Sequence, residues 1–333
     1  MSLELTDKDG LIDAFQRRIN YLRVSVTDRC NLNCIYCLAG SVSHLSHEDI
    51  LRYEEIYRVV QVAAGMGINK VRLTGGEPLV RPDLSKLVRM LSQIEGVDDL
   101  SLTTNGTLLS RYAVELKEAG LKRVNVSLDT LKRARFKRIT GVDKLEEVLD
   151  GIRAAHSAGL LPLKINMVVL RGINDDEVVD FARMSIDQGW HVRFIELMPF
   201  REPETECLGI VSAREIRERV QSLGELEPGA VRAGNGPARY YRLPGADGTV
   251  GFISPITEPF CRSCNRLRIV PGGQLQPCLL ASNEVNLKET LRNGAGVDEL
   301  KRLIRQAVAI KPEQYLLREG FASVKRPMCQ IGG

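Results

Sequence analysis

Three thiols lie within eight residues in the stretch Cys30-Asn31-Leu32-Asn33-Cys34-Ile35-Tyr36-Cys37. The stretch follows an alternating apolar run over residues 21–26, which is typical of a β-strand. Three cysteines suit a cubane iron–sulfur cluster in which one iron keeps no protein ligand. That iron is then available to bind a small molecule. We therefore expect an iron–sulfur cluster in this loop.

Two other interpretations of these cysteines are open. A buried helix would bring positions i, i+4 and i+7 to one face, but Asn31 and Asn33 are weak helix formers. A structural zinc ion usually takes four ligands, so its fourth ligand would have to come from a distant segment. The spacing favours a cluster over both.

The C-x3-C-x2-C spacing, with Tyr36 before the last cysteine, resembles the signature of the radical S-adenosylmethionine (SAM) superfamily. In that superfamily the open iron chelates the methionine part of SAM, and an electron from the cluster releases a 5′-deoxyadenosyl radical. The segment Gly75-Gly76-Glu77-Pro78 resembles the superfamily's second motif, which binds the amino group of SAM. Taken alone, such a segment is more often an ordinary turn after a strand.

The composition is that of a globular protein. The chain has 333 residues, of which 44% are hydrophobic and 26% charged, and one large domain plus a smaller one is the natural expectation. No apolar run approaches the ~20 residues that span a bilayer. Residues 1–9 are polar and acidic, unlike a signal peptide, so we expect a cytoplasmic protein. The net charge of +4 is too mild to argue for nucleic-acid binding.

Residues 13 to about 200 alternate between short apolar strands and amphipathic helices. This alternation predicts parallel strands joined by right-handed crossovers, with the site at their C-terminal ends. Six units are too few for a closed eight-stranded barrel, so we expect an α/β fold with an open, partial (β/α)6 TIM-like barrel. The expected strands are 22–27, 70–74, 100–104, 123–127, 163–169 and 192–197. The expected helices are 53–65, 84–94, 109–119, 145–158 and 176–188. A basic run over residues 132–138 is interpreted as one solvated helix face.

The composition changes after residue 199, and residues 227–251 are rich in Gly, Pro and Arg. We place a domain boundary near residue 228. This gives an N-terminal tail (1–12), a barrel domain (13–228) and a smaller C-terminal α+β domain (229–333). A helix at 212–223 should begin with Ser212 as its N-cap. In the C-terminal domain we expect strands at 240–243, 250–253 and 267–270 and helices at 287–293 and 297–310.

A second cysteine triplet, Cys261, Cys264 and Cys278, lies in the C-terminal domain. A zinc site that recruits Cys329 is an open alternative, but only one C-x2-C pair is present and no histidine is nearby. Three thiols again favour a cluster with one open iron. Cys329 and Cys207 are interpreted as structural or incidental.

The order of C-x3-C-x2-C, GGEP, C-x2-C-x13-C and a terminal Gly-Gly resembles the GTP 3′,8-cyclase family, also called the molybdenum cofactor biosynthesis protein A family. The resemblance covers residues 15–333. It implies two [4Fe-4S] clusters, SAM as cofactor and GTP as substrate. In the implied reaction the radical takes the 3′ hydrogen of GTP and the sugar then attacks C8. The product is 3′,8-cyclo-7,8-dihydro-GTP, the first intermediate toward molybdopterin.

The resemblance also implies a set of site residues. The clusters would be held by Cys30, Cys34 and Cys37 and by Cys261, Cys264 and Cys278. SAM contacts would come from Tyr36, Gly75, Gly76, Glu77, Ser127, Arg193 and Met198, with Arg193 open to either ligand. GTP contacts would come from Arg23, Arg72, Thr103, Lys164, Arg266, Leu267 and Arg268. Five of these (Arg23, Arg72, Lys164, Arg266 and Arg268) are cations, as a triphosphate requires, and Arg266 and Arg268 share one face of a strand.

The terminal Gly332-Gly333 would thread into the active site in this family, although a flexible end is the usual fate of a terminus. One departure from the family is Leu38-Ala39-Gly40, where Met-Pro is common after the third cysteine. The loop over residues 234–241 resembles a family loop and has no assigned role.

Further expectations concern partners. We expect a flavodoxin-like or similar electron donor, transfer of the product to the next enzyme of the pathway, and a homodimer, because the family is often dimeric. Two other functions are open: another radical SAM enzyme with an auxiliary cluster, such as a peptide-modifying one, and a zinc-stabilised α/β binding module. Metal analysis separates the last from the others.

Overall fold

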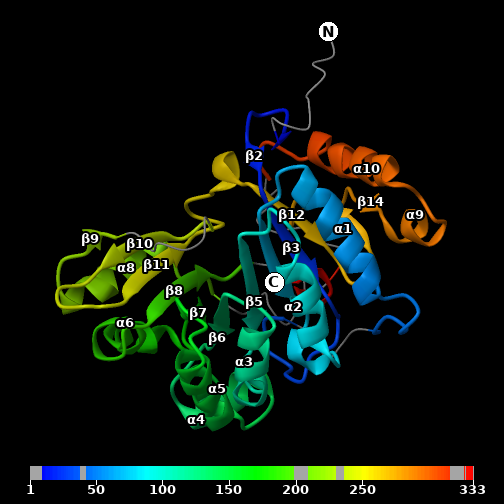
Figure 1. The fold of residues 1–333 in the computed structure, drawn as a ribbon. Coiled ribbons are helices and arrows are strands. Elements are labelled where there is room, and N and C mark those ends of the chain that lie inside the picture. The colour runs from blue at the N-terminus through cyan, green and yellow to red at the C-terminus, as the bar shows by residue number, and fades with distance from the viewer. Residues whose placement is uncertain are drawn as a thin grey trace.

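One open, twelve-stranded sheet organises the protein (Figure 1). The computed structural model describes residues 10–37, 43–198, 209–229, 236–315, 326 and 328–332. Strand order across the sheet is β14-β13-β12-β3-β4-β5-β6-β7-β8-β11-β10-β9. The run from β12 to β11 is parallel throughout. The predicted α/β class with a parallel sheet is confirmed. Within the described residues no pairing of β14 with β9 closes the sheet.

The six strands expected from the apolar runs form the centre of this sheet, and each bound lies within two residues of its prediction. Their side chains are buried on both faces because helices cover the outside and the site lies on the inside. These strands are β3 (Tyr21–Ser25), β4 (Lys70–Thr74), β5 (Asp99–Thr104), β6 (Arg123–Ser127), β7 (Lys164–Val169) and β8 (His191–Glu196).

Amphipathic helices follow the strands and cover the outer face of the sheet (Figure 1). They form where apolar residues recur at helical spacing, as in the α5 positions Leu145, Val148 and Ile152, which are all buried. Gly120 follows α3 with φ of +102°, the left-handed conformation that glycine adopts readily after a helix. The helices are α1 (Tyr53–Gly65), α2 (Leu84–Ser92), α3 (Leu109–Glu118), α4 (Arg133–Thr140), α5 (Leu145–Ser157) and α6 (Val178–Asp187).

Strands from the C-terminal part of the chain extend this sheet at both ends. β11 (Thr249–Ile253) pairs with β8, and β12 (Arg266–Ile269) pairs with β3, both in parallel. The boundary near residue 228 stays a prediction, and the sheet continues across it. Antiparallel strands lie outside these two: β10 (Arg239–Arg242), β9 (Glu227–Pro228), β13 (Gln274–Gln276) and β14 (Val285–Asn286).

The remaining elements pack around the sheet. Ser212 caps α8 by accepting a hydrogen bond from the Glu215 main-chain N–H, as expected. A hairpin and a short C-terminal helix were not predicted. These elements are α8 (Ala213–Val220), α9 (Lys288–Arg292), α10 (Val297–Ala309), α11 (Met328–Ile331), β1 (Leu11–Ile12) and β2 (Arg18–Ile19).

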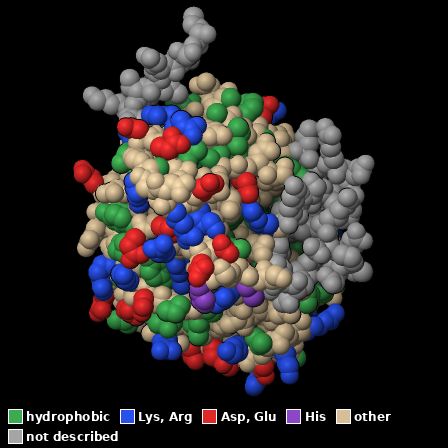
Figure 2. Space-filling view, turned by 90° about the vertical axis from the view of Figure 1, so that its right-hand side faces the viewer, with side chains coloured by type: hydrophobic (Ala, Val, Ile, Leu, Met, Phe, Trp, Pro, Cys, Tyr) green, Lys and Arg blue, Asp and Glu red, His purple; other side chains and the backbone are tan. Residues whose placement is uncertain are grey.

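The surface carries intermixed charges on the face shown in Figure 2, where Lys and Arg alternate with Asp and Glu. The basic side chains of α4 fit this description, because Arg133 pairs with Asp143 and Arg135 with Asp176. The predicted solvated helix face is confirmed. None of the described helices combines the length and the apolar composition that crossing a bilayer requires.

Parallel register brings polar residues of neighbouring strands into rows on the inner face of the sheet. Arg268, Arg23 and Arg72 are directly paired on β12, β3 and β4. Farther along the sheet, Ser127, Asn166 and Arg193 are paired on β6, β7 and β8. Since alternate residues of a strand share a face, these rows project to the same side. The sheet thereby concentrates cationic side chains in one place.

Candidate active site

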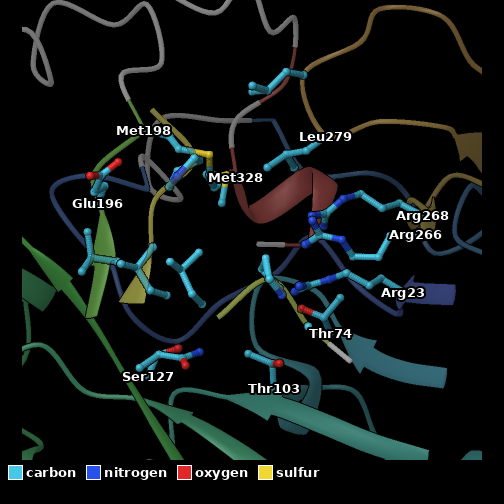
Figure 3. Close-up of a pocket in the computed structure, with 18 of the residues that line it drawn as sticks. Arg23, Thr74, Thr103, Ser127, Glu196, Met198, Arg266, Arg268, Leu279 and Met328 are labelled. Carbon is cyan, nitrogen blue, oxygen red and sulfur yellow. The ribbon is translucent and has the colours of Figure 1, made fainter. Parts of the chain in front are cut away.

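Both cysteine triplets line one cavity of about 510 Å³ at the C-terminal ends of the parallel strands. Figure 3 shows side chains converging on this cavity from β3, β5, β6 and β12. The predicted cluster ligands that line it are Cys30, Cys34, Cys37, Cys261, Cys264 and Cys278. Among the predicted ligand-binding residues, it is lined by Arg23, Tyr36, Arg72, Gly75, Gly76, Thr103, Ser127, Arg193, Met198, Arg266 and Arg268.

The first cysteine loop is held against the end of β4 by main-chain contacts. The Gly76 N–H donates to the Thr27 carbonyl, and the Glu77 N–H donates to the Arg29 carbonyl, both at 2.8 Å. A Cβ on Gly75 would lie 2.5 Å from the Thr27 carbonyl oxygen, and one on Gly76 would collide with the Arg29 carbonyl. The two glycines are therefore required by the close approach of two backbones, a reason distinct from contact with a ligand.

Glu77 connects the loops that follow β4 and β5, and it is not among the residues that line the cavity. Its carboxylate accepts hydrogen bonds from the Leu79 N–H at 3.0 Å, the Thr104 hydroxyl at 2.8 Å and the Asn105 N–H at 2.6 Å. Burial raises the pKa of Glu77 to about 7 in spite of these three donors. These bonds indicate that Glu77 has a structural role and holds the loop after β4 against the loop after β5.

Asn105 carries this connection to the cysteine loop. Its Nδ2 donates to Asn31 Oδ1 at 2.8 Å, and Asn31 Nδ2 donates to Thr107 Oγ1 at 2.8 Å. Asn31, one of the two asparagines that argued against a helix in the sequence, thus fastens the loop to the residues that follow β5. Asn105 itself was not predicted as a site residue.

Tyr36 is fixed on the other side of the cavity. Its hydroxyl donates to Asp129 Oδ2 at 2.6 Å, and the Val168 N–H donates to Asp129 Oδ1 at 2.8 Å. Burial raises the pKa of Asp129 to about 6, and burial together with Asp129 raises the pKa of Tyr36. Tyr36 thus joins the cysteine loop to the ends of β6 and β7.

Cationic side chains collect inside the cavity with few acidic partners. Burial lowers the pKa of Arg72 and of Arg268 to about 10, because a charged group loses solvation there. The Nε and Nη2 atoms of Arg193 are buried and have no hydrogen-bond partner among the described residues. The acidic residues at the cavity, Asp129 and Glu196, are already engaged by main-chain N–H groups. A cluster of buried arginines with so few acidic partners favours an anionic ligand, which would compensate their positive charge.

Two predicted substrate residues do not line the cavity. The Lys164 side chain is buried, with 2% of the residue exposed, and its Nζ is 5.6 Å from the centre of the Tyr240 ring. Burial, with Arg193, Arg123 and Arg72 nearby, lowers the pKa of Lys164 to about 6. Leu267 points into the hydrophobic core, because it alternates with Arg266 and Arg268 along β12. Leu267 therefore lies between Arg266 and Arg268 in the sequence, but its side chain faces away from the cavity.

Comparison with known protein families matches two models to the chain. Residues 24–185 match the radical SAM superfamily, and residues 190–317 match the family described as Molybdenum Cofactor Synthesis C. The first match contains the Cys30 loop and the second contains the Cys261 loop. Together the two matches account for both cysteine triplets.

Relatives of nearly the same length decide the family. A protein named GTP 3′,8-cyclase from Pelotomaculum thermopropionicum is 52% identical over 96% of this chain and 99% of the relative. Proteins of the same name from Moorella thermoacetica and Heliobacterium modesticaldum are 50% and 49% identical, over 96% and 97% of this chain and 99% and 100% of the relatives. The chain belongs to the GTP 3′,8-cyclase family.

A solved structure supports the fold assignment. Streptococcus suis SuiB bound to S-adenosylmethionine is similar with a TM-score of 0.62, at 16% identity, over 86% of this chain and 68% of that one. The likeness concerns the fold alone. It agrees with a radical SAM sheet at the centre of this member of the GTP 3′,8-cyclase family.

The donor sets fit the cofactors of the GTP 3′,8-cyclase family. Each cysteine triplet supplies three thiols to the cavity, which is the number that leaves one iron of a cubane cluster open. Around Cys264, burial raises the pKa of the thiol, but Arg266 and Lys311 outweigh burial and lower it to about 6. Two [4Fe-4S] clusters and SAM are therefore the cofactors, and the two cysteine triplets are the residues that would hold the clusters.

Several residues at the site of this GTP 3′,8-cyclase family member were not predicted from the sequence. The side chains of Cys37 and Cys329 are hydrogen-bonded to each other, so the cysteine interpreted as incidental lies beside the first cysteine triplet. Tyr21 lines the cavity, and Arg17 and Lys311 hold the second cysteine loop. No motif marks these positions, and Arg17, Lys311 and Cys329 are each distant in sequence from the cysteines that they contact. Cys207, Gly333 and residues 38–40 lie outside the described residues, as do residues 234 and 235 at the start of the 234–241 loop.

Proposed function

We propose that this chain is a radical SAM GTP 3′,8-cyclase. It converts GTP to 3′,8-cyclo-7,8-dihydroguanosine 5′-triphosphate, the first step of molybdopterin synthesis. The observation that carries the proposal is that two cysteine triplets and a group of buried arginines face one cavity. Membership of the GTP 3′,8-cyclase family supports the same conclusion.

The arginines are suited to the triphosphate. Arg23, Arg72 and Arg268 stand side by side on neighbouring strands, so their guanidinium groups can bind successive phosphate oxygens. Arg266 lies two residues from Arg268 on the same face of β12 and beside the second cysteine loop. Substrate binding neutralises a set of charges that the fold buries at a cost.

The first cysteine loop is suited to SAM. When bound there, SAM and the first cluster would supply the radical chemistry that acts on the 3′ hydrogen of GTP. Gly75 and Gly76 present their backbone, Ser127 lies at the end of β6, and Met198 follows β8 at the rim.

Another radical SAM enzyme with an auxiliary cluster, such as a peptide-modifying one, is the second candidate function. It would also use both cysteine triplets. The buried row of arginines favours a polyanionic nucleotide over a peptide. Metal analysis distinguishes the third alternative, a zinc-stabilised binding module, from both enzymes, because the module would contain zinc in place of iron and sulfide.

The test is an anaerobic assay of the protein reconstituted with iron and sulfide. We expect 5′-deoxyadenosine, measured by mass spectrometry, to form in a GTP-dependent manner together with an isomeric GTP-derived product. Arg268→Met should abolish this dependence, whereas Arg262→Met should retain it, because Arg262 is exposed on the cysteine loop that precedes β12. SAM cleavage that is unaffected by GTP would contradict GTP as the substrate.

Other proposals concern the cellular setting. We propose a cytoplasmic location, supported by clustered free thiols that a reducing compartment preserves. A flavodoxin-like or similar electron donor, transfer of the product to the next enzyme and a homodimer remain proposals. The division into residues 13–228 and 229–333 is likewise proposed.

A further inference from the structure

Lys311 lies at a buried point behind the second cysteine loop. It follows α10 and is 3% exposed. Its Nζ is 2.6 Å from the Pro277 carbonyl oxygen, 2.8 Å from the Arg266 carbonyl oxygen and 3.5 Å from Cys264 Sγ. An ammonium group has three N–H donors, and here three acceptors surround it. The geometry therefore accommodates the charged form of the side chain.

The acceptors of Lys311 belong to both segments that carry the second triplet. Pro277 directly precedes Cys278, and Arg266 is two residues after Cys264. One ammonium group therefore joins the Cys264 segment to the Cys278 segment. Without it, two main-chain carbonyls and a thiol would face a buried space with no donor.

Arg17 reaches the third ligand position from the hairpin β1–β2. Its Nη1 donates to the Cys261 carbonyl at 2.7 Å and to the Glu313 carbonyl at 2.8 Å, and its Nη2 donates to the Pro312 carbonyl at 2.7 Å. Its Nε donates to Asp13 at 2.6 Å, which fixes the guanidinium plane. Since residues 312–313 directly follow Lys311, Arg17 also positions Lys311.

We infer that Lys311, held by Arg17, is a positioning residue for the second iron–sulfur cluster and sets its electron affinity. The inference rests on the proposed function insofar as that function assigns a cluster to Cys261, Cys264 and Cys278. The ammonium group keeps the three ligand positions at their spacing. A reduced cluster carries one more negative charge than an oxidised one, so a buried cation beside Cys264 stabilises the reduced form.

The first test is the variant Lys311→Met, which keeps the length of the side chain and removes its charge and donors. The full chain is reconstituted anaerobically, and iron and sulfide per chain are measured. A redox titration followed by electron paramagnetic resonance reports each cluster, and a Cys30→Ala background isolates the second. We expect loss of about half of the bound iron, or a second-cluster potential shifted to more negative values, with the first cluster unchanged.

Control variants distinguish positioning of the second cluster by Lys311 from a general contribution of Lys311 to the stability of the fold. Lys311→Arg should restore much of the iron, because it keeps the charge. Arg302→Met, on the exposed side of α10, should leave iron content and both potentials as in the wild type. Arg17→Lys should lose part of the second-cluster iron, because one ammonium group cannot span the carbonyls that the guanidinium fork reaches.

Two results would overturn the inference. One is a Lys311→Met chain with wild-type iron content and unchanged potentials. The other is equal loss of both clusters in Lys311→Met and Arg17→Lys, which would reflect general unfolding. Because these readouts do not require GTP, a wild-type chain that fails to cyclise GTP would refute the proposed function and leave this inference standing on its own measurements.

Discussion

The main-chain carbonyl of Gly332 accepts a hydrogen bond of 2.8 Å from Nη1 of Arg268. The C-terminal end of the chain thereby contacts an arginine assigned to the substrate triphosphate. Figure 3 shows the short red helix α11 beside Arg23, Arg266 and Arg268, and Met328 beside Met198. Gly332 has φ of +70° and lies against Ser25 and Thr74 at the ends of β3 and β4. Residues 328–332 thus form part of the wall of the cavity that we propose to bind GTP.

Gly332→Ala should lower GTP cyclisation strongly while both clusters and SAM binding persist. A Cβ at this position would lie 2.7 Å from Thr74 Cγ2, which forces the tail away from Arg268. The measurement is product yield beside iron content. Gly172→Ala is the matched control, because Gly172 has φ of +69° and open space around it. The control should lose about 1 kcal/mol of stability and no activity. Wild-type product yield in Gly332→Ala would refute a role for the tail.

Gly76→Ala should prevent assembly of the first cluster and leave the second in place. The added Cβ would collide with the Arg29 carbonyl, so the GGEP segment and the cysteine loop must separate. Iron per chain should fall by about half in the otherwise wild-type chain, and almost to zero in a Cys261→Ala background, which isolates the first cluster. Gly65→Ala, at the end of α1 with nothing near its Cβ, should retain the cluster and gain about 0.5–1 kcal/mol of stability. Full iron retention in Gly76→Ala would contradict the close-packing explanation.

Tyr21→Phe should weaken GTP binding and make the GTP-free protein slightly more stable. The Tyr21 hydroxyl is buried, and it has no hydrogen-bond partner among the described residues. Loss of a hydrogen bond to a charged phosphate should raise KM for GTP about tenfold. Removing an unsatisfied buried hydroxyl should raise the unfolding free energy by up to ~1 kcal/mol. Steady-state kinetics and thermal unfolding measure the two effects.

Tyr53→Phe is the control for this prediction. The Tyr53 hydroxyl donates to the Pro82 carbonyl at 2.7 Å, away from the cavity. Its loss should cost about 1 kcal/mol of stability and leave KM unchanged. If Tyr21→Phe also lost stability and kept its KM, Tyr21 would be an ordinary core residue.

His191 should make stability fall as the pH is lowered from 6.5 toward 4. Burial, with Lys164, Arg242 and Arg193 nearby, lowers the pKa of His191 to about 4. Between the ordinary pKa of ~6.5 and the folded value, the unfolded chain binds the proton more readily, so acid favours unfolding. Because the ring is only partly buried, the effect should amount to about 1–2 kcal/mol.

The check is the pH dependence of Tm in the wild type and in His191→Asn. Asparagine can keep the hydrogen bond that His191 Nδ1 makes with Thr249 Oγ1 at 2.9 Å. The variant should lose less Tm than the wild type between pH 7.5 and 5. Equal slopes in the two proteins would show that His191 does not contribute.

The local structure followed from the sequence where the pattern was periodic. The strand at 70–74 and the helix at 53–65 agree with β4 and α1 to the residue, because apolar spacing and chain breaks specify such elements locally. The expected strands at 250–253 and 267–270 also exist as β11 and β12. We assigned these two strands to a separate C-terminal domain, whereas in the structure β11 pairs with β8 and β12 pairs with β3. Strand partners depend on packing between distant segments, which a local pattern does not carry.

By itself, the sequence determined the chemistry: two cysteine triplets whose spacing is tied to iron–sulfur ligation, a GGEP segment and arginines on strands. These features depend only on residue type and local spacing. The tertiary structure alone decided which groups act together. It brought Lys311 to Cys264, Cys329 to Cys37 and Gly332 to Arg268, contacts that span 47, 292 and 64 positions of the chain. Such contacts arise because the parallel sheet gathers strand ends from the whole chain at one edge, where a buried charge or thiol must find a partner.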